Sequence, residues 1–343
     1  MDLTALNDIA VRMVAPGKGI LAADESSGTI KKRFDSINVD STEDNRRDYR
    51  EMLFRTDSAM QDHISGVILF DETIRQKAAD GTPLVKVIEA AGSIPGIKVD
   101  KGAKALAGAS GETVTEGLDG LRERLNEYYA LGARFAKWRA VIDIAGDDIP
   151  SGYGISTNAH ALARYAALCQ EAGIVPIVEP EVLMDGDHDI DRCYDVTEYT
   201  LKALFDELYA QDVELEGTIL KPNMVVSGKK CPKQASIEEV AERTVHCFRM
   251  SVPAALPGIV FLSGGQSDEE ATAHLNAMNA GYKDKMPWAL SFSYGRALQA
   301  APLKAWSGKS ENVAAGQRAF AHRAKMNGLA QLGDWSKDQE NAA

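Results

Sequence analysis

The sequence has few cysteines, no long apolar stretch and no leader pattern at its N-terminus. Its four cysteines, at positions 169, 193, 231 and 247, have neither C-x-x-C nor disulfide-framework spacing, which fits a reducing compartment. No apolar stretch approaches the roughly 20 residues that cross a bilayer. The first residues, Met1-Asp2-Leu3-Thr4, show no signal-peptide pattern. We therefore expect a cytoplasmic protein with no membrane partner.

The chain also lacks an excess of positive charge. Its formal net charge of −12 argues against nucleic acid as a bulk partner, although a local basic pocket could still bind an anionic small molecule. A length of 343 residues suffices for one large barrel or two ordinary domains. No linker or shift in composition divides the chain before about residue 330. We expect one domain over residues 1–330 and a polar, mobile tail over residues 331–343.

What the sequence does contain is a repeated short apolar run, often led by glycine and spaced roughly 30–50 residues from the next. Eight such runs occur: Gly19–Asp24, Gly66–Asp71, Gly96–Lys101, Ala133–Ala140, Ile174–Glu181, Gly217–Asn223, Gly258–Gly264 and Trp288–Gly295. Each spacing leaves room for a crossover helix between parallel strands.

Segments with helical periodicity lie between and around these runs. We predict helices at Leu3–Val14, Glu43–Met60, Ala159–Gly173, Thr197–Tyr209 and Asn312–Asn327, and helix starts with capping boxes at Ser236–Glu239 and Ser267–Glu270. Eight strands, each followed by a helix, indicate an α/β fold of the (β/α)8 TIM-barrel type rather than an open doubly wound sheet.

Catalytic residues of such barrels lie at the C-terminal ends of the strands. Charged residues stand at these positions in runs that otherwise read as buried: Asp24, Lys137, Arg139, Glu179, Glu181 and Lys221. Residues i and i+2 of a strand share one face. The 137/139 and 179/181 pairs should therefore face the barrel interior, while Trp138 and Pro180 face the helices.

Lys221 ends a short apolar run that Pro222 terminates. An ammonium in such a place must be paired, reach solvent or lose its proton. A neutral lysine amine attacks carbonyls to form a Schiff base, and neighbouring carboxylates can move the protons. The predicted mouth therefore favours imine chemistry on a carbonyl substrate.

Two groups of residues suit phosphate binding. After the seventh run, Ser263-Gly264-Gly265 offers backbone amides, and after the eighth, Arg296 offers a planar guanidinium. Lys101 with Ser26, Ser27 or Arg33 could hold a second phosphate. Sites on opposite sides of one mouth would suit a substrate phosphorylated at both ends.

Long stretches of the chain closely resemble the class I, Schiff-base, fructose-bisphosphate aldolases. The resemblance runs from about Gly17 to Asn327 and rests on GILAADES, GVILFDET, GIKVDKG, FAKWR, IVPIVEPE, DGDHD, FLSGGQS and WALSFSYGRALQ, among others. It implies reversible cleavage of fructose 1,6-bisphosphate to dihydroxyacetone phosphate and glyceraldehyde 3-phosphate, without a metal or other cofactor, in a homotetramer.

The resemblance also implies roles for single residues. Lys221 is similar to the imine-forming lysine, Asp24 to the base that takes the C4 hydroxyl proton, and Glu179 to the acid–base group of imine formation. Lys137 resembles the lysine that assists carbinolamine breakdown, and Glu181 the partner that orients the lysines. The implied C1-phosphate residues are Ser263, Gly264, Gly265, Gly295 and Arg296, and the residues at or near the C6 phosphate are Lys101, Ser26, Arg33 and Arg139. Ser293 is a further predicted substrate-binding residue.

The chain departs from the animal members of this family at its C-terminus. Those enzymes end in a tyrosine that folds over the site and helps proton exchange at C3, whereas this chain has no tyrosine after Tyr294. The resemblance therefore leaves open which group relays that proton here.

Two other interpretations remain. A metal-dependent aldolase would polarise the carbonyl with Zn²⁺, but the six histidines show no ligand spacing, and the Asp185–Asp191 acidic loop fails the EF-hand pattern at Ile190 and Val196. The alternative of a catalytically silent barrel that serves as a binding or scaffold protein has the same fold.

Overall fold

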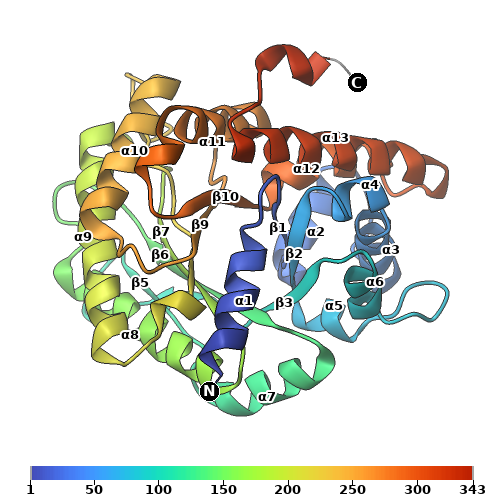
Figure 1. The fold of residues 1–343 in the computed structure, drawn as a ribbon, viewed down its shortest axis with the longest axis horizontal. Helices are drawn as coiled ribbons and strands as arrows, with labels where there is room; N and C mark the ends of the chain where they lie inside the picture. The colour runs from blue at the N-terminus through green and yellow to red at the C-terminus, as the bar shows by residue number, and fades with distance from the viewer. Residues whose placement is uncertain (1, 342–343) are drawn as a thin grey trace.

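The structure of this chain is a computed structural model that describes residues 2–341. Eight parallel strands close into a barrel in the spatial order β1-β10-β9-β8-β7-β6-β3-β2, and helices surround it (Figure 1). The predicted (β/α)8 barrel is confirmed. Each predicted run overlaps one barrel strand: β1 (Gly19–Ala23), β2 (Ile64–Leu69), β3 (Ile94–Lys98), β6 (Phe135–Ile142), β7 (Val175–Val182), β8 (Ile219–Leu220), β9 (Gly258–Phe261) and β10 (Ala289–Tyr294).

The helices occupy most of the chain between these strands. They are α1 (Leu3–Met13), α2 (Ser27–Asp35), α3 (Glu43–Phe54), α4 (Asp57–Met60), α5 (Asp71–Arg75), α6 (Leu84–Ala90), α7 (Leu121–Leu131), α8 (Gly152–Glu171), α9 (Ile190–Ala210), α10 (Ile237–Ser251), α11 (Asp268–Tyr282), α12 (Arg296–Trp306) and α13 (Val313–Leu332). Within residues 2–341, no helix is long and apolar enough to cross a membrane.

The predicted helix starts at two serines are present. Ser267 accepts a hydrogen bond from the Glu270 amide, and Glu270 accepts one from the Ser267 amide, which completes the capping box. At the start of α10, Ser236 accepts a hydrogen bond from the Glu239 amide, but the return bond to Glu239 is not among the contacts of this cap, so the predicted second capping box is only half formed. These contacts satisfy amides that have no partner inside the helix.

The prediction of one continuous helix over Glu43–Met60 is wrong, because the helix breaks at Thr56. The Thr56 amide donates to the carbonyl of Leu53, and its hydroxyl donates to the carbonyl of Met52 at 2.9 Å. Its ψ of 81° leaves the helical region, so α4 begins as a separate turn. A short antiparallel hairpin, β4 (Ala103–Ala105) with β5 (Thr113–Thr115), was also not predicted.

The barrel interior is apolar at its N-terminal end, where α1 lies across the opening (Figure 1). Leu6, Ala10 and Met13 of α1 pack in one cluster with inward-facing strand residues such as Phe135 and Ile177. Burial of this apolar surface removes it from water and closes the barrel at that end. Polar chemistry is therefore confined to the opposite end.

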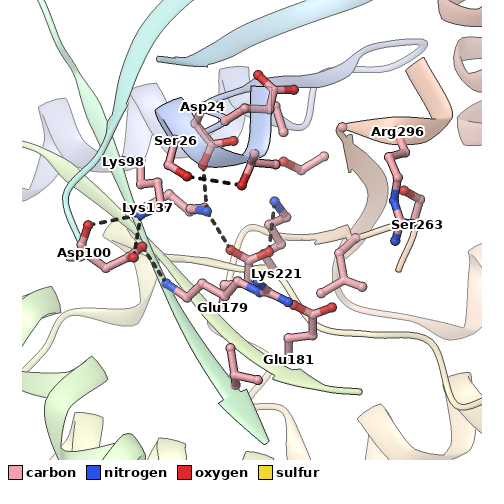
Figure 2. Close-up of a pocket in the computed structure, with 18 of the residues that line it drawn as sticks. Asp24, Ser26, Lys98, Asp100, Lys137, Glu179, Glu181, Lys221, Ser263 and Arg296 are labelled. Atoms are coloured by element: carbon pink, nitrogen blue, oxygen red, sulfur yellow. Dashed lines mark hydrogen bonds and ion pairs between the residues drawn. The ribbon is translucent and has the colours of Figure 1, made fainter. Parts of the chain in front are cut away.

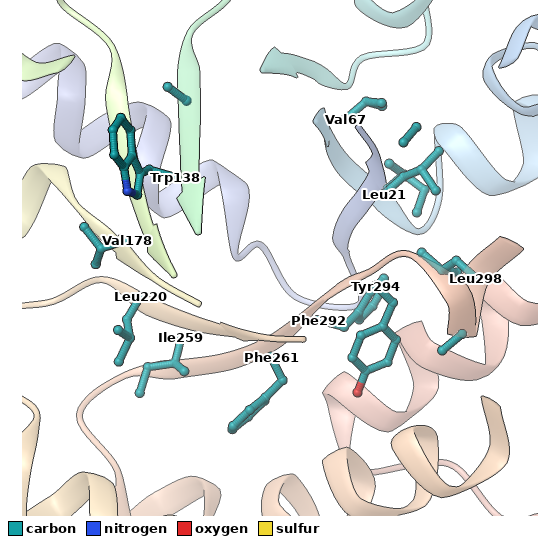
Figure 3. Packing of buried hydrophobic residues seen from close by; sticks show 14 of the residues in the cluster. Leu21, Val67, Trp138, Val178, Leu220, Ile259, Phe261, Phe292, Tyr294 and Leu298 are labelled. Carbon is teal, nitrogen blue, oxygen red and sulfur yellow. The ribbon is translucent and has the colours of Figure 1, made fainter. Parts of the chain in front are cut away.

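The larger apolar core lies between the strands and the surrounding helices. Figure 3 shows part of it, with Leu21, Val178, Leu220 and Phe261 on the outer side of the barrel. Successive strand residues alternate between this layer and the interior, so every strand is buried on both faces. The core is continuous around the barrel and holds the strand ends in fixed positions.

The end of the chain follows α13, which runs to Leu332 and stops at Gly333 with φ of 83°. The next residues include a 3₁₀ turn over Lys337–Asn341. Glu340 accepts hydrogen bonds from Arg323 at 2.5 Å and from the Trp335 indole at 3.0 Å. Residues 342 and 343 of the predicted tail lie outside the described residues. The mobility of this tail stays a prediction.

Phe135 leaves no room for a side chain at Gly96 inside the barrel. A Cβ at Gly96 would lie 2.3 Å from the Phe135 ring, which is fully buried. We expect Gly96→Ala to lower the free energy of unfolding by about 1–3 kcal/mol, because the core must shift to accept the methyl group. Urea unfolding followed by circular dichroism measures this change.

Gly281→Ala on α11 is the matched control, since its Cβ would meet no atom within 4 Å. Alanine has the higher helix propensity, so we expect this variant to be more stable by up to about 1 kcal/mol. Equal unfolding midpoints for the two variants would contradict the packing argument.

Candidate active site

A pocket of about 350 Å³ opens at the C-terminal ends of the strands. All the predicted site residues line it except Lys101 and Gly265: Asp24, Ser26, Arg33, Lys137, Arg139, Glu179, Glu181, Lys221, Ser263, Gly264, Ser293, Gly295 and Arg296. The structure thus gathers predicted residues from six strand ends in one concave site, where barrel enzymes place their chemistry.

Alternation along β6 explains how charged residues enter this pocket. Phe135 belongs to the interior cluster, and Lys137 and Arg139 follow it on the same face and line the pocket. Trp138 points to the helices, where its ring packs on Tyr165 of α8 at a centroid distance of 5.6 Å. The predicted inward direction of the 137/139 pair is therefore present in the structure.

The same alternation on β7 and β8 brings Glu179 and Lys221 together. Both side chains are almost fully buried, and Lys221 Nζ lies 3.0 Å from Glu179 Oε1. Lys137 Nζ lies 3.2 Å from the other oxygen of Glu179. Figure 2 shows Glu179 between the two lysines. A single carboxylate therefore contacts both ammonium groups.

Lys137 links this carboxylate to Asp24 at the end of β1. The Asp24 Oδ2 to Lys137 Nζ distance is 2.7 Å. Burial alone would raise the pKa of Asp24, but the charges of Lys137 and Lys221 outweigh it and lower the pKa to about 2. Asp24 is consequently ionised at neutral pH and can accept a proton.

The pKa shifts of the neighbouring Lys137 and Glu179 also favour the charged form of each group. Burial opposes the charged form of Lys137, yet Asp24 and Glu179 raise its pKa above the ordinary value. Burial likewise opposes ionisation of Glu179, while Lys137, Lys221 and Arg139 lower its pKa. The group is thus a network of mutually stabilised charges rather than isolated ions.

Glu181 contacts Arg139, not the lysines. Its Oε2 atom accepts a hydrogen bond from Arg139 Nε. Burial opposes the charged form of Arg139, but the negative charges of Glu181 and Glu179 outweigh burial and raise the pKa of Arg139. The resemblance implied that Glu181 orients the lysines. In the structure its carboxylate contacts Arg139, and the orienting role stays a prediction.

The predicted phosphate turn lies on one side of the pocket. Gly264 has φ of +55°, a conformation that glycine adopts without strain, and its carbonyl accepts from the Arg296 guanidinium. Ser293 Oγ is buried, lines the pocket and has no hydrogen-bond partner among the described residues. An unpaired buried hydroxyl at a pocket wall is suited to bind a ligand atom.

The other side of the pocket differs from the prediction. Lys98, the last residue of β3, lines the pocket with Asp100 and pairs with it at 2.6 Å, whereas Lys101 is exposed and lies outside the lining. Arg33 is held at 2.6 Å by Glu25, which the sequence analysis also missed. The spacing of two residues between Lys98 and Asp100 was the signal that could have identified this lysine.

Figure 2 places Lys98 and Arg296 on opposite sides of the central lysines. The pocket therefore has cations at its two ends and an ionised lysine–carboxylate network between them. This arrangement fits a molecule with an anionic group at each end and a reactive group between them.

Metal ligands do not gather in this part of the chain. Within residues 2–341, no group of three or more His, Cys, Asp or Glu side chains has the geometry to hold a metal ion. Some histidines contact other side chains, such as His246 with Tyr194 at 2.8 Å and His160 with Glu207 at 3.0 Å.

Comparison with known proteins gives the family. The sequence profile described as "Fructose-bisphosphate aldolase class-I" matches residues 5–343. The chain is 64% identical over 336 residues to the probable fructose-bisphosphate aldolase class 1 of Xanthomonas campestris pv. campestris. The aligned residues cover 98% of this chain and 99% of that protein. It is 58% identical over 325 residues to cytosolic fructose-bisphosphate aldolase 4 of Arabidopsis thaliana, over 95% of this chain and 82% of that one.

A solved structure gives the same family. The fructose-bisphosphate aldolase of Plasmodium falciparum, crystallised with TRAP and a small-molecule inhibitor, superposes with a TM-score of 0.94 at 49% identity, over 97% of this chain and 96% of that one. The chain therefore belongs to the class I fructose-bisphosphate aldolase family. The family, the fold and the enzymatic class predicted from the sequence are confirmed.

The low pKa of Asp24 predicts a pH-dependent contribution to stability. The value falls from 3.8 to about 2 in the folded protein. A depressed folded-state pKa stabilises the fold fully above pH ~4, and this contribution is lost as the pH falls through ~2. We expect the difference in free energy of unfolding between wild type and Asp24→Asn to shrink by roughly 2 kcal/mol from pH 5 to pH 2.

Urea unfolding of both proteins at matched ionic strength, in steps across this range, measures the difference. A difference that stays constant down to pH 2 would show that Asp24 is not held in its charged form by the lysines.

Proposed function

We propose that this chain catalyses the reversible aldol cleavage of fructose 1,6-bisphosphate to dihydroxyacetone phosphate and glyceraldehyde 3-phosphate through an imine on Lys221. The observation that carries the proposal is the buried chain of contacts from Lys221 through Glu179 and Lys137 to Asp24. It provides a nucleophile, a proton-transfer group and a base within one pocket. The reaction needs no metal or other cofactor.

Imine formation uses the contact between Lys221 and Glu179. Glu179 accepts a proton from the Lys221 ammonium, and the free amine attacks C2 of the open-chain ketose. The carbinolamine loses its hydroxyl as water, with Glu179 and Lys137 supplying and removing the protons. The product is a protonated imine, which withdraws electrons from C3.

Carbon–carbon cleavage uses Asp24. This carboxylate takes the proton of the C4 hydroxyl, the C3–C4 electron pair moves toward the imine carbon, and glyceraldehyde 3-phosphate leaves. The remaining enamine takes a proton at C3, and hydrolysis releases dihydroxyacetone phosphate and the Lys221 amine. The ionised state of Asp24 at neutral pH supports this step.

The two cationic ends of the pocket support the substrate's orientation. The C1 phosphate would lie at Ser263 and Gly264 with Arg296, and the adjacent Gly265 amide is on the same turn. The C6 phosphate would lie toward Lys98, with Ser26, Arg33 and Arg139 also lining the pocket, and Lys101 stays a predicted contact. This orientation brings C2 to Lys221 and C4 to Asp24.

We further propose that the enzyme works in the cytoplasm as a homotetramer. Relatives in Arabidopsis thaliana are named as cytosolic, which supports the location. The tetramer rests on resemblance to the family. Sedimentation equilibrium of the purified protein tests it, and a single species of 37.0 kDa would contradict it.

Borohydride trapping tests the mechanism. The protein is incubated with dihydroxyacetone phosphate in EDTA, reduced and digested, and the adduct is located by peptide mass. A reduced adduct on Lys221 supports the imine. Activity that disappears in EDTA without an adduct would support a metal enzyme, and neither adduct nor turnover would support a scaffold.

Lys221→Met should leave the barrel folded and lower kcat for bisphosphate cleavage by roughly three orders of magnitude or more, because the electron sink cannot form. Coupled assay of glyceraldehyde 3-phosphate measures kcat, and circular dichroism checks the fold. Lys202→Met on α9 is the matched control, because Lys202 is exposed and lies outside the pocket. Near-normal turnover of Lys221→Met would refute the proposal.

A further inference from the structure

Lys229 lies beside the phosphate turn but was not among the predicted site residues. It belongs to the segment between β8 and α10, which is joined to the segment between β7 and α9 by backbone hydrogen bonds. The amides of Gly228, Lys229 and Lys230 donate to the carbonyls of His188, Met184 and Gly186 at 2.7–2.9 Å. The two segments approach so closely that a Cβ on Gly228 would lie 2.3 Å from the Gly186 carbonyl oxygen. The backbone of Lys229 is therefore fixed.

The side chain of Lys229 lies directly over Gly265, the last residue of the phosphate turn. A Cβ built on Gly265 would be 1.8 Å from Lys229 Cε and 2.1 Å from Nζ. The ammonium thus occupies space that the missing side chain of Gly265 leaves free. The Arg296 guanidinium donates a hydrogen bond to the carbonyl of Gly264, the preceding residue of this turn. Two cations consequently flank one short turn.

Asp185 holds the Lys229 ammonium in the structure. Their Nζ to Oδ1 distance is 2.6 Å, and both side chains are exposed to solvent, at 39% and 62%. The hydrogen bond from Lys229 is the main cause of a lowered pKa at Asp185, to which the charges of Arg296 and Lys230 also contribute. Exposed ion pairs of this kind are weak and exchange partners easily.

We propose that Lys229 is an additional phosphate-binding residue, which transfers its ammonium from Asp185 to the phosphate held at the Ser263–Gly265 turn. The inference deepens the proposed function, because it takes the sugar's C1 phosphate as the ligand. A phosphate dianion carries more charge than a carboxylate and accepts more hydrogen bonds, so it competes with Asp185 for the ammonium. Asp185 serves as the counterion that positions Lys229 before the phosphate arrives.

Loss of Lys229 should affect substrate binding and not the chemical step. Lys229 contacts the phosphate and not the reacting carbons, so its loss should weaken binding of the ground state and the transition state alike. We expect Lys229→Met to raise KM for fructose 1,6-bisphosphate, and Kd for dihydroxyacetone phosphate measured by calorimetry, by about tenfold. The value of kcat should change less than about twofold.

Two further variants make the test specific. Lys230→Met removes the same charge from the next residue, whose side chain is exposed, and should change Kd less than about twofold. Asp185→Asn removes the competing carboxylate and should leave Kd unchanged or lower it. A merely structural Lys229–Asp185 pair would instead weaken binding equally in Lys229→Met and Asp185→Asn.

The outcomes are distinct. Tenfold weaker binding in Lys229→Met alone supports the inference. An unchanged Kd in Lys229→Met overturns it. Equal increases in Kd in Lys229→Met and Lys230→Met overturn it in favour of a diffuse positive potential. Equal increases in Kd in Lys229→Met and Asp185→Asn overturn it in favour of a structural Lys229–Asp185 pair. Borohydride trapping on Lys221 is unaffected in each of these cases, whereas failure of the proposed function would abolish trapping in the wild type itself.

Discussion

The Lys137 ammonium between Asp24 and Glu179 is the interaction on which the candidate site depends. All three side chains are buried or nearly so, and each would be costly to bury alone. Removing one partner would leave an uncompensated charge in the barrel, which is far more destabilising than the loss of an exposed pair. The same network brings Lys221 to Glu179. The electrostatics that make this cluster tolerable in the fold are therefore the electrostatics that the proposed chemistry uses.

Strand alternation explains why such a cluster can exist in a stable barrel. Val175 and Ile177 on β7 fill the interior near α1, and Glu179 and Glu181 continue the same face toward the open end. The intervening Val178 packs in the outer core. The apolar half of each inward face is thus sealed, while the polar half opens to solvent and ligand. The residues that stabilise the barrel and the residues that line the pocket therefore lie at different heights along the same strands, and no position has to serve both purposes.

The sequence predicted the elements that obey this periodicity and missed features set by a strand boundary, by a local side-chain hydrogen bond or by contacts between distant loops. Lys137 and Arg139 could be placed because their run is long and its alternation clear. Lys98 was missed because the predicted third run was set too far along the chain, which moved the expected strand end to Lys101. The break at Thr56 depends on one hydroxyl that bonds to its own helix. Lys229 could not be found from sequence, since its proximity to Gly265 arises only when two separate loops are joined.

The distribution of charge reconciles a chain of net charge −12 with an anionic substrate. At physiological ionic strength, exposed charges act over about 8 Å, so the acidic outer surface contributes little inside the pocket. Within it, Arg33 pairs with Glu25 and Lys98 with Asp100, while Arg296 donates to the Gly264 carbonyl, so each of these cations has a defined orientation. In the proposed binding mode, each phosphate meets cations that are already positioned, and less conformational entropy is lost on binding. Glu25 and Asp100 thus fix the positions of these cations, although each carboxylate also offsets part of the positive charge of its partner.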